Sequence, residues 1–239
     1  MKISLCIPMY NEASIIENTA RTLSAYMSEH FEDYEILFSN DGSTDDSVEL
    51  VSALGLPFVR VVGYEKNRGK GAAVREAVLA STGDIVMFTD ADLAYGTEVI
   101  SRMVKAFEED PQADAVIGSR NLQGDGYEGY TAIRKLASKA YIKLLCAVGG
   151  LRLSDSQCGC KAFRGDMARR IFSCCEVNGF AFDFEAIMIG TRLGARFFEL
   201  PVKVINHRES KVHVLSDALK MVKDVQRMKK RVAKLELKQ

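Results

Sequence analysis

Short apolar runs alternate with segments of helical periodicity through the first half of the chain. The runs predict buried strands over 3–8, 35–39, 58–63, 85–89 and 115–118. Between them, apolar residues recur every three or four positions, which predicts helices that include 69–80 and 97–109. Asn11 is suited to cap the first helix, and Ser43 or Thr44 the second. The alternation predicts an α/β fold whose mostly parallel central sheet has helices on both faces.

The second half of the chain is less regular. Its pattern predicts helices over 131–148, 166–172 and 184–193, a short strand within 155–163 and a strand over 197–205. Pro201 has no backbone N–H to donate, so the last strand must lie at a sheet edge or contain a bulge. No repeat, low-complexity segment or linker divides the chain, and we expect one domain over 1–239.

Residues 211–239 predict a final helix with one apolar stripe and many cations. The stripe consists of Val212, Leu215, Leu219, Val222, Val225 and Met228, and lysines and arginines crowd the other faces. A basic amphipathic helix of this kind can lie on an anionic bilayer surface. A surface helix packed on the core, or a coiled-coil contact, explains the same pattern.

Composition narrows the class of protein. The 239 residues are 47% hydrophobic, which is ample for a sizeable core, and the formal net charge of zero argues against a general nucleic-acid binder. There is no apolar run of about 18 residues, so we expect no membrane-spanning segment, and residues 1–8 resemble a strand more than a signal peptide. The six cysteines lack the spacing of a zinc site, which favours reduced thiols in a cytosolic protein.

Two carboxylates, Asp90 and Asp92, come directly after the apolar run 85–88. In an open parallel sheet, ligands bind at the C-terminal ends of the strands. Residues two apart on an extended chain point the same way, so these side chains could share one hard cation that clamps a diphosphate. An isolated Asp-x-Asp is also typical of a solvated turn that caps the next helix. Polar loops at other strand ends favour the cation site.

Two of those loops lie upstream. Residues 8–12 read Pro-Met-Tyr-Asn-Glu, and residues 40–46 read Asn-Asp-Gly-Ser-Thr-Asp-Asp. Asp41 could accept a base N–H and Tyr10 could stack on the base, although each loop taken alone is typical of a turn or a helix cap. The glycines within 69–71 match neither a dinucleotide fingerprint nor a P-loop. A nucleotide site in this chain must therefore be assembled from strand ends.

Seven motifs in register carry a resemblance to one family. They are 8–12, 40–47, 67–71, 90–92, 155–161, 182–185 and 207–212. In this order and approximate spacing the chain resembles family 2 glycosyltransferases, which have a GT-A fold, over about 1–225. The last three motifs are similar to the polyprenyl-phosphate branch, especially dolichyl-phosphate glucosyltransferases. Cys160 departs from that branch, in which an aromatic residue is common at this position.

The resemblance implies roles for individual residues. It assigns the nucleoside to Pro8, Tyr10, Glu12 and Asp41, the metal ion (Mg²⁺ or Mn²⁺) and the diphosphate to Asp90 and Asp92, and nucleotide or phosphate contacts to Lys70, Arg120, Gln157, Lys161 and Arg208, with Arg134 and Lys211 as further candidates. It also implies a nucleotide-sugar half over 1–119, an acceptor half over 120–210 and the basic helix over 211–239.

The implied reaction transfers a hexose from a nucleoside diphosphate to a polyprenyl or dolichyl phosphate, with inversion. The residues at 155–159 favour UDP-glucose over GDP-mannose as the donor. A phosphate monoester is mostly dianionic near neutral pH, so a strong general base is unnecessary. We expect Asp155 to orient the nucleophile or to accept a proton, with Gln157, Asp183 and Glu185 as polar neighbours. The first turn of a helix also explains Asp183 and Glu185.

The sequence leaves two other functions open. A family 2 transferase that acts on a polysaccharide needs the same donor site but no basic grip on a phosphate. A membrane-recruited scaffold that binds a nucleotide sugar needs no turnover, and the carboxylates at 90, 92 and 155 together with Arg120 argue against it. For a lipid-phosphate acceptor, we expect a cytoplasmic protein that lies peripherally on the cytoplasmic face of a membrane.

Overall fold

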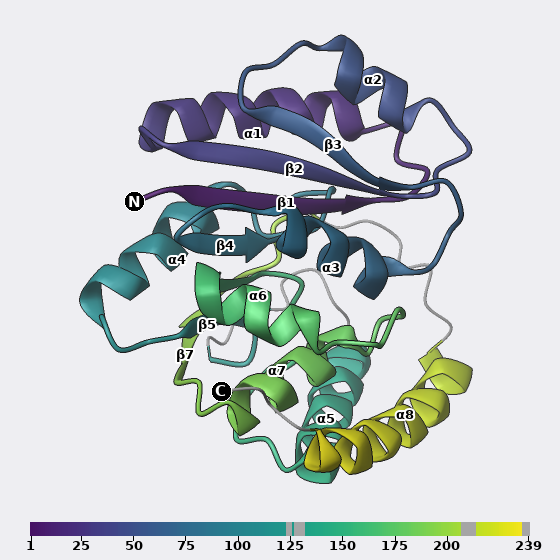
Figure 1. Cartoon of the computed structure of the whole chain (residues 1–239). Helices are drawn as coiled ribbons and strands as arrows, with labels where there is room; N and C mark the ends of the chain where they lie inside the picture. Colours follow the sequence, from purple (N-terminus) through teal and green to yellow (C-terminus); the bar gives the residue numbers. More distant parts are fainter. Residues whose placement is uncertain (123–125, 127–131, 207–213, 236–239) are drawn as a thin grey trace.

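The computed structural model describes residues 1–122, 126, 132–206 and 214–235, and Figure 1 shows its elements around one central sheet. Along the chain these are β1 (Ile3–Met9), α1 (Ile16–His30), β2 (Tyr34–Asp41), α2 (Ser47–Ala53), β3 (Val59–Tyr64), α3 (Lys70–Ala80), β4 (Ile85–Phe88), α4 (Glu98–Glu109), β5 (Ala115–Ser119), α5 (Ala132–Gly149), β6 (Lys161–Arg164), α6 (Gly165–Ser173), α7 (Phe182–Arg192), β7 (Phe197–Pro201) and α8 (Val214–Lys234).

The sheet is mostly parallel, as the alternation predicts. In the described part of the chain its strand order is β3-β2-β1-β4-β6-β5-β7. The pairs β1–β2, β1–β4, β2–β3 and β5–β7 are parallel, whereas β6 runs antiparallel to both β4 and β5. Strand β7 lies at the edge and ends at Pro201, four residues before the predicted end, because a proline cannot extend the ladder.

Two hydrophobic cores cover the two faces of the sheet. Alternate side chains of β1 point to opposite faces, so Leu5 and Ile7 pack with α1 and α4, while Cys6 packs in the other core. That second core contains residues of α3, α5, α6, α7 and α8. The period-two pattern of the apolar runs and the helices on both faces are therefore confirmed.

The predicted caps of the first two helices are wrong. Helix α1 begins after Ile15 and α2 after Asp46, and neither residue makes a side-chain capping hydrogen bond. Asn11 instead adopts a left-handed backbone (φ 52°), and its side-chain oxygen accepts a hydrogen bond from the Thr44 N–H at 2.8 Å. Polar side chains that could cap helices here join the β1 and β2 loops to one another.

Helix α8 packs on α5 and α7, at the opposite end of the molecule from α2 (Figure 1). Two residues of its predicted apolar stripe, Val225 and Met228, are buried in the second core together with Val232, one turn further on. The described helices are all too short or too polar to cross a bilayer. Packing of this helix on the core therefore explains the apolar period of its described part, as the alternative of a surface helix packed on the core expects.

Candidate active site

Three polar loops meet at one edge of the sheet. Strand β1 lies between β2 and β4 and runs parallel to both, so their C-terminal ends are neighbours. Tyr10, Asp41 and Asp90 stand in the chain just where these strands end. Figure 1 shows the arrowheads of β1, β2 and β4 pointing in the same direction. The sequence predicts this convergence.

The β1 and β2 loops are held together by hydrogen bonds from backbone amides. The N–H of Asn11 donates to Ser43 Oγ at 3.1 Å, and the N–H of Glu12 donates to Ser47 Oγ at 2.9 Å. Pro8 and Glu12 are half-buried, while Tyr10 keeps 41% of its surface exposed. An exposed aromatic ring on a fixed loop can stack on a ligand, so the expected role of Tyr10 stays a prediction.

Asp41 is buried and organises the turn that follows β3. Its carboxylate accepts hydrogen bonds from Tyr64 Oη at 2.8 Å, from the side chain of Asn67 at 3.0 Å and from the N–H groups of Arg68 and Gly69 at 2.8 and 3.0 Å. Burial, together with the Asp41 charge, raises the pKa of Tyr64. The carboxylate predicted to meet a base therefore fixes the backbone immediately before Lys70.

Asp90 and Asp92 lie in a turn after β4, and the argument from an extended chain is wrong here. Strand β4 ends at Phe88, and Leu93 adopts a left-handed backbone (φ 50°). Asp92 Oδ1 accepts a hydrogen bond from the Ala94 N–H at 3.1 Å, which is the turn contact that the alternative explanation expects. Both carboxylates are half-buried, so each keeps exposed surface at the sheet edge.

Lys70 forms an ion pair with Asp90, which joins the β2, β3 and β4 loops into one site. The two side chains keep 26% and 29% of their surface exposed. Burial lowers the pKa of the Lys70 ammonium, but the charge and hydrogen bond of Asp90, together with the charges of Asp183 and Asp92, outweigh it, and the pKa is raised. Lys70 is thus a fixed cation beside the paired aspartates, close to where the resemblance places a nucleotide.

The donor set at this edge fits a magnesium or manganese ion that a diphosphate also coordinates. Among the described residues no cluster of three or more His, Cys, Asp or Glu side chains could hold a metal, so the protein offers the carboxylates of Asp90 and Asp92. Mg²⁺ is commonly bound by one or two carboxylates, with substrate phosphates and water completing the shell. These two aspartates match that pattern.

Gly159, in the segment that precedes β6, packs directly against the carboxylate of Asp90. A Cβ atom at this position would lie 2.3 Å from Asp90 Oδ2, so no larger residue fits without displacing that carboxylate. The Gly159 N–H donates to Tyr95 Oη at 3.2 Å. Because β6 runs antiparallel to β4, the segment that precedes β6 lies at the same edge as the strand ends. This brings residues 155–160 to the paired aspartates.

Asp155 and Arg120 form a buried bidentate ion pair. Arg120 Nε donates to Asp155 Oδ2 at 2.7 Å, its terminal nitrogen donates to Oδ1 at 3.0 Å, and the Gln157 N–H also donates to Oδ1 at 3.2 Å. Asp155 has no exposed surface. Because the guanidinium engages both carboxylate oxygens, this geometry favours the orienting role of Asp155 over that of a base.

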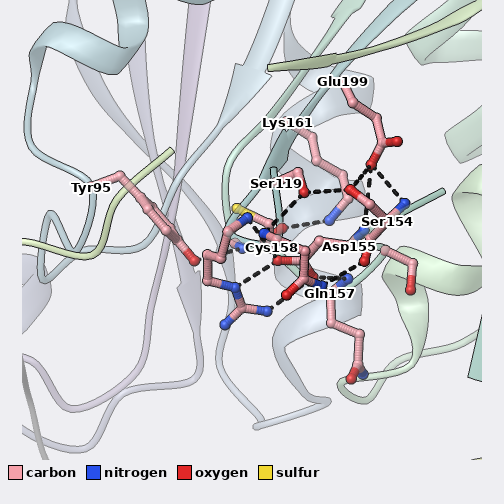
Figure 2. A network of polar contacts seen from close by, with 12 residues as sticks. Tyr95, Ser119, Ser154, Asp155, Gln157, Cys158, Lys161 and Glu199 are labelled. Atoms are coloured by element: carbon pink, nitrogen blue, oxygen red, sulfur yellow. Dashed lines mark hydrogen bonds and ion pairs between the residues drawn. The ribbon is translucent and has the colours of Figure 1, made fainter. Parts of the chain in front are cut away.

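A polar network supports this ion pair from behind. Figure 2 shows Glu199, Ser154 and Ser119 beside Asp155, with Glu199 Oε1 accepting from the N–H and Oγ of Ser154 at 2.8 and 2.7 Å. Ser154 Oγ lies 2.5 Å from Ser119 Oγ. Glu199 is a member of this network that the motifs in the sequence do not single out. A signal was available, since it is an acidic residue inside an apolar predicted strand.

Lys161 and Asp183 form a second ion pair inside the protein. Lys161 Nζ lies 2.8 Å from Asp183 Oδ1 and donates to the Cys158 carbonyl, and Lys161 has no exposed surface. Burial raises the pKa of Asp183, and the Lys161 charge opposes that shift. The Lys161 ammonium points to these protein partners (Figure 2), and its expected contact with a phosphate stays a prediction.

The remaining predicted residues are spread over different environments. Gln157 is half-buried next to Asp155. Glu185 is fully buried but faces another part of the protein, where its carboxylate accepts from the N–H groups of Glu176 and Val177 and pairs with Arg231. Its expected place beside Asp155 is therefore corrected. Arg208, Lys211 and the side chain of Arg134 lie outside the described residues.

Comparison with known proteins agrees with this fold. The chain is 31% identical over 230 residues to a dolichyl-phosphate beta-glucosyltransferase of Trichomonas vaginalis, covering 92% of this chain and 68% of the relative. It is 27% identical to that of Saccharomyces cerevisiae, covering 93% and 72%. Glucosyl-3-phosphoglycerate synthase from Mycobacterium tuberculosis, solved with Mn²⁺, UDP-glucose and glycerol 3-phosphate, superposes with a TM-score of 0.71 at 21% identity, covering 98% and 81%.

These likenesses have different weight. The structural match, at its low identity, shows the shared GT-A fold. The family model for glycosyl transferase family 2 matches residues 4–172, which is well over half of the chain. The strand-end loops, the paired aspartates and the segment before β6 all lie within that match. The chain belongs to glycosyl transferase family 2.

Proposed function

We propose that this protein transfers glucose from UDP-glucose to a polyprenyl phosphate such as dolichyl phosphate, with inversion and with help from a divalent cation. The observation that carries the proposal is the likeness, over more than nine-tenths of the chain, to dolichyl-phosphate beta-glucosyltransferases. The convergence of Asp41, Lys70 and Asp90 at one sheet edge supports a donor site there. The half-buried Arg120 supports a phosphorylated acceptor.

The donor site consists of the three strand-end loops. Tyr10, with Pro8 and Glu12 beside it, presents an aromatic ring to the nucleoside. Asp41 fixes the turn that precedes Lys70 by accepting a hydrogen bond from the Arg68 N–H. Contact between Asp41 and the base requires the base to join or replace the hydrogen bonds that now occupy this carboxylate. Lys70 places its ammonium where it can donate to an oxygen of the diphosphate.

The paired aspartates serve the leaving group. A divalent cation held by Asp90 and Asp92 would offset the negative charge that develops on the diphosphate as its bond to the sugar breaks. Lys70 adds a second positive charge from the same side, and its partner Asp90 keeps the ammonium oriented. Gly159, by packing against Asp90, limits the positions that this carboxylate can adopt.

The acceptor side orients a nucleophile that is already charged. A phosphate monoester is mostly dianionic near neutral pH, so its oxygen can attack the anomeric carbon in line with the leaving diphosphate. Arg120 supplies the positive charge for that phosphate, and Asp155 fixes the guanidinium by two hydrogen bonds. Residues 1–119 would then bind the donor and 120–210 the acceptor.

Helix α8 would bring this site to a membrane surface. Arg227, Lys230 and Lys234 are exposed and recur at helical spacing, while Val225, Met228 and Val232 face the core. A face of this charge suits a bilayer with anionic lipids, which is where a polyprenyl phosphate resides. We place the protein peripherally on the cytoplasmic face of such a membrane.

A direct assay tests the proposal. The protein is incubated with UDP-glucose or GDP-mannose, with Mg²⁺, Mn²⁺ or a chelator, and with a polyprenyl phosphate, 3-phosphoglycerate or an oligosaccharide as acceptor. Mass spectrometry identifies the product, and NMR of its anomeric proton reports whether the configuration inverts. We expect a metal-dependent glucosyl lipid phosphate. Transfer only to the oligosaccharide would favour a polysaccharide transferase, and donor binding without any product would favour a scaffold.

A further inference from the structure

The segment 174–179, between α6 and α7, is a junction at which three helices meet. It contacts α8 through Arg231, α7 through Glu185, and the beginning of α3 through Asn178. None of these contacts belongs to the strand ends that form the donor site. These hydrogen bonds and ion pairs, together with the backbone between them, nevertheless lead from Arg231 to Gly71, the residue next to Lys70.

On the α8 side, one arginine and one carboxylate hold the segment. Arg231 donates to the Cys174 carbonyl at 3.0 Å and pairs with Glu176 at 3.0 Å and with the buried Glu185 at 2.5 Å. The other oxygen of Glu185 accepts from the N–H groups of Glu176 and Val177 at 2.8 and 2.7 Å. Because Glu185 has no exposed surface, loss of Arg231 would leave a buried charge without its cation.

On the α3 side, the backbone of Asn178 receives the start of a helix. Its carbonyl accepts from the Gly71 N–H at 2.7 Å, and its side-chain oxygen accepts from Arg75 at 2.8 Å. The two backbone segments are in close contact. A Cβ on Gly69 would lie 2.5 Å from the carbonyl oxygen of Asn178, and a Cβ on Gly71 would lie 2.5 Å from that of Val177. A displacement of the segment must therefore displace Gly69, Lys70 and Gly71 with it.

The start of α3 is also part of the donor site. The Gly69 N–H donates to both oxygens of Asp41 at 3.0 Å, and the next residue, Lys70, pairs with Asp90. The first turn of α3 thus contacts Asn178 through Gly71 and Asp90 through Lys70. The fit at this turn is fixed from both sides, by Asp41 from the sheet and by Asn178 from the segment.

We propose that Arg231 and Glu185 are positioning residues for the donor site, which they hold in its binding geometry through the 174–179 segment and the first turn of α3. The inference rests on the proposed donor site at Lys70 and Asp90. Arg231 does not touch the reacting atoms. Its loss would let the first turn of α3 move, and part of the binding free energy of the donor would then be used to order this turn again. The effect is expected in donor affinity and KM more than in kcat.

The test compares Arg231→Met with Arg192→Met. Arg192 also ties α7 to α8, by donating to the carbonyls of Ala233 and Leu235, but it makes no contact with the 174–179 segment that the structure shows. Calorimetry with UDP and Mn²⁺ gives the donor affinity, a thermal melt gives stability, and the transfer assay gives KM and kcat. We expect Arg231→Met to weaken UDP binding about threefold to tenfold with kcat within about twofold, and Arg192→Met to leave binding unchanged.

Two further variants keep the test decisive. Arg231→Lys retains a cation for Glu185 and should recover part of the lost affinity. Asn178→Ala removes the contact with Arg75 on the far side of the segment, and it should also weaken UDP binding, even if Arg231→Met fails to fold. Equal binding by Arg231→Met and wild type overturns the inference, as does equal weakening by Arg192→Met. For an unfolded Arg231→Met, unchanged binding by Asn178→Ala overturns it. Wild-type protein that binds no UDP overturns the donor site itself, and this inference with it.

Discussion

The proposed donor and acceptor sides of the site hold their carboxylates in different environments. On the donor side, Asp90 keeps 29% of its side chain exposed, and Asp92 is likewise half-buried in a turn. On the acceptor side, Asp155 is fully enclosed and Asp183 almost so, and each is paired with a cation, Arg120 or Lys161. Asp90 also pairs with a cation, Lys70, but it and Asp92 keep surface that a ligand can reach, whereas Asp155 and Asp183 are enclosed with the cations that they hold.

This difference indicates that exposure, more than residue type, separates acids that can contact a ligand from acids that hold other side chains in place. A buried carboxylate is stable only when it is paired and hydrogen-bonded, and once it is paired its oxygens are no longer available. We therefore expect Asp155 to act through Arg120 and Asp92 to act directly. Substitutions on the two sides should consequently give different signatures.

The largest expected effect comes from Asp92→Asn on the donor side. Loss of one negative charge from the paired aspartates should lower kcat/KM for glucosyl transfer by about 1,000-fold, because stabilisation of the leaving diphosphate falls. The thermal melt should stay close to wild type, since this carboxylate is half-buried. Asp166→Asn, in an exposed ion pair on α6, is the matched control. Full activity of Asp92→Asn in a chelator would refute the role.

A carboxylate far from both sides provides the second comparison. Glu35 is desolvated, which by itself would raise its pKa, but hydrogen bonds from Ser4, Thr82 and Arg60 lower the pKa to about 2 from 4.5. Because the folded pKa is the lower one, the stabilisation is present above pH 4.5 and is lost as the pH falls through about 2. Glu35→Gln should lower the free energy of unfolding at pH 7 by about 3 kcal/mol, roughly 100-fold in the unfolding constant.

Urea titrations from pH 7 to pH 2 would measure this change. The difference between Glu35→Gln and wild type should shrink as the solution becomes acidic, while transfer activity per folded molecule stays the same. A difference that is constant with pH would contradict the assigned pKa direction.

The acceptor side should respond through Arg120. Asp155→Asn removes the charge that orients the guanidinium, and we expect well over tenfold loss of kcat/KM with a higher KM for the lipid phosphate. For the orienting role, we expect the acid limb of the pH profile to keep its position. Near-normal turnover would refute any role, and loss of the acid limb would show that Asp155 is a base after all. Arg120→Lys should be non-additive with it.

The smallest effect is expected on α8. Each of Lys230→Glu and Lys234→Glu should weaken binding to vesicles that contain anionic lipid by at least about fivefold, corresponding to about 1 kcal/mol per cation. Added salt should reduce the difference from wild type. Lys105→Glu, on exposed surface of α4, is the control. Deletion of 211–239 is a poorer test, because Val225, Met228 and Val232 belong to the core. Unchanged vesicle binding by both variants would exclude this face as the anchor.

The sequence predicts the sheet well because strands and buried helices leave a clear apolar period. It places the polar loops at the right strand ends, since the ends of parallel neighbours must meet. It fails for the caps at Asn11 and Ser43, where side chains that suit a helix start instead join two loops. It also misplaces Glu185, because no local pattern reveals that this buried carboxylate will pair with Arg231. For the same reason it does not reveal the pairing of Lys161 with Asp183.

The reversed direction of β6 has a consequence for how the protein is made. Strands β1, β2 and β4 are complete once residue 88 has been synthesised, but one edge of β4 has no partner until residues 161–164 have left the ribosome. An unpaired strand edge invites wrong pairing with other chains. The short length of β4, Ile85–Phe88, limits that risk until β6, and Gly159 just before it, have been synthesised.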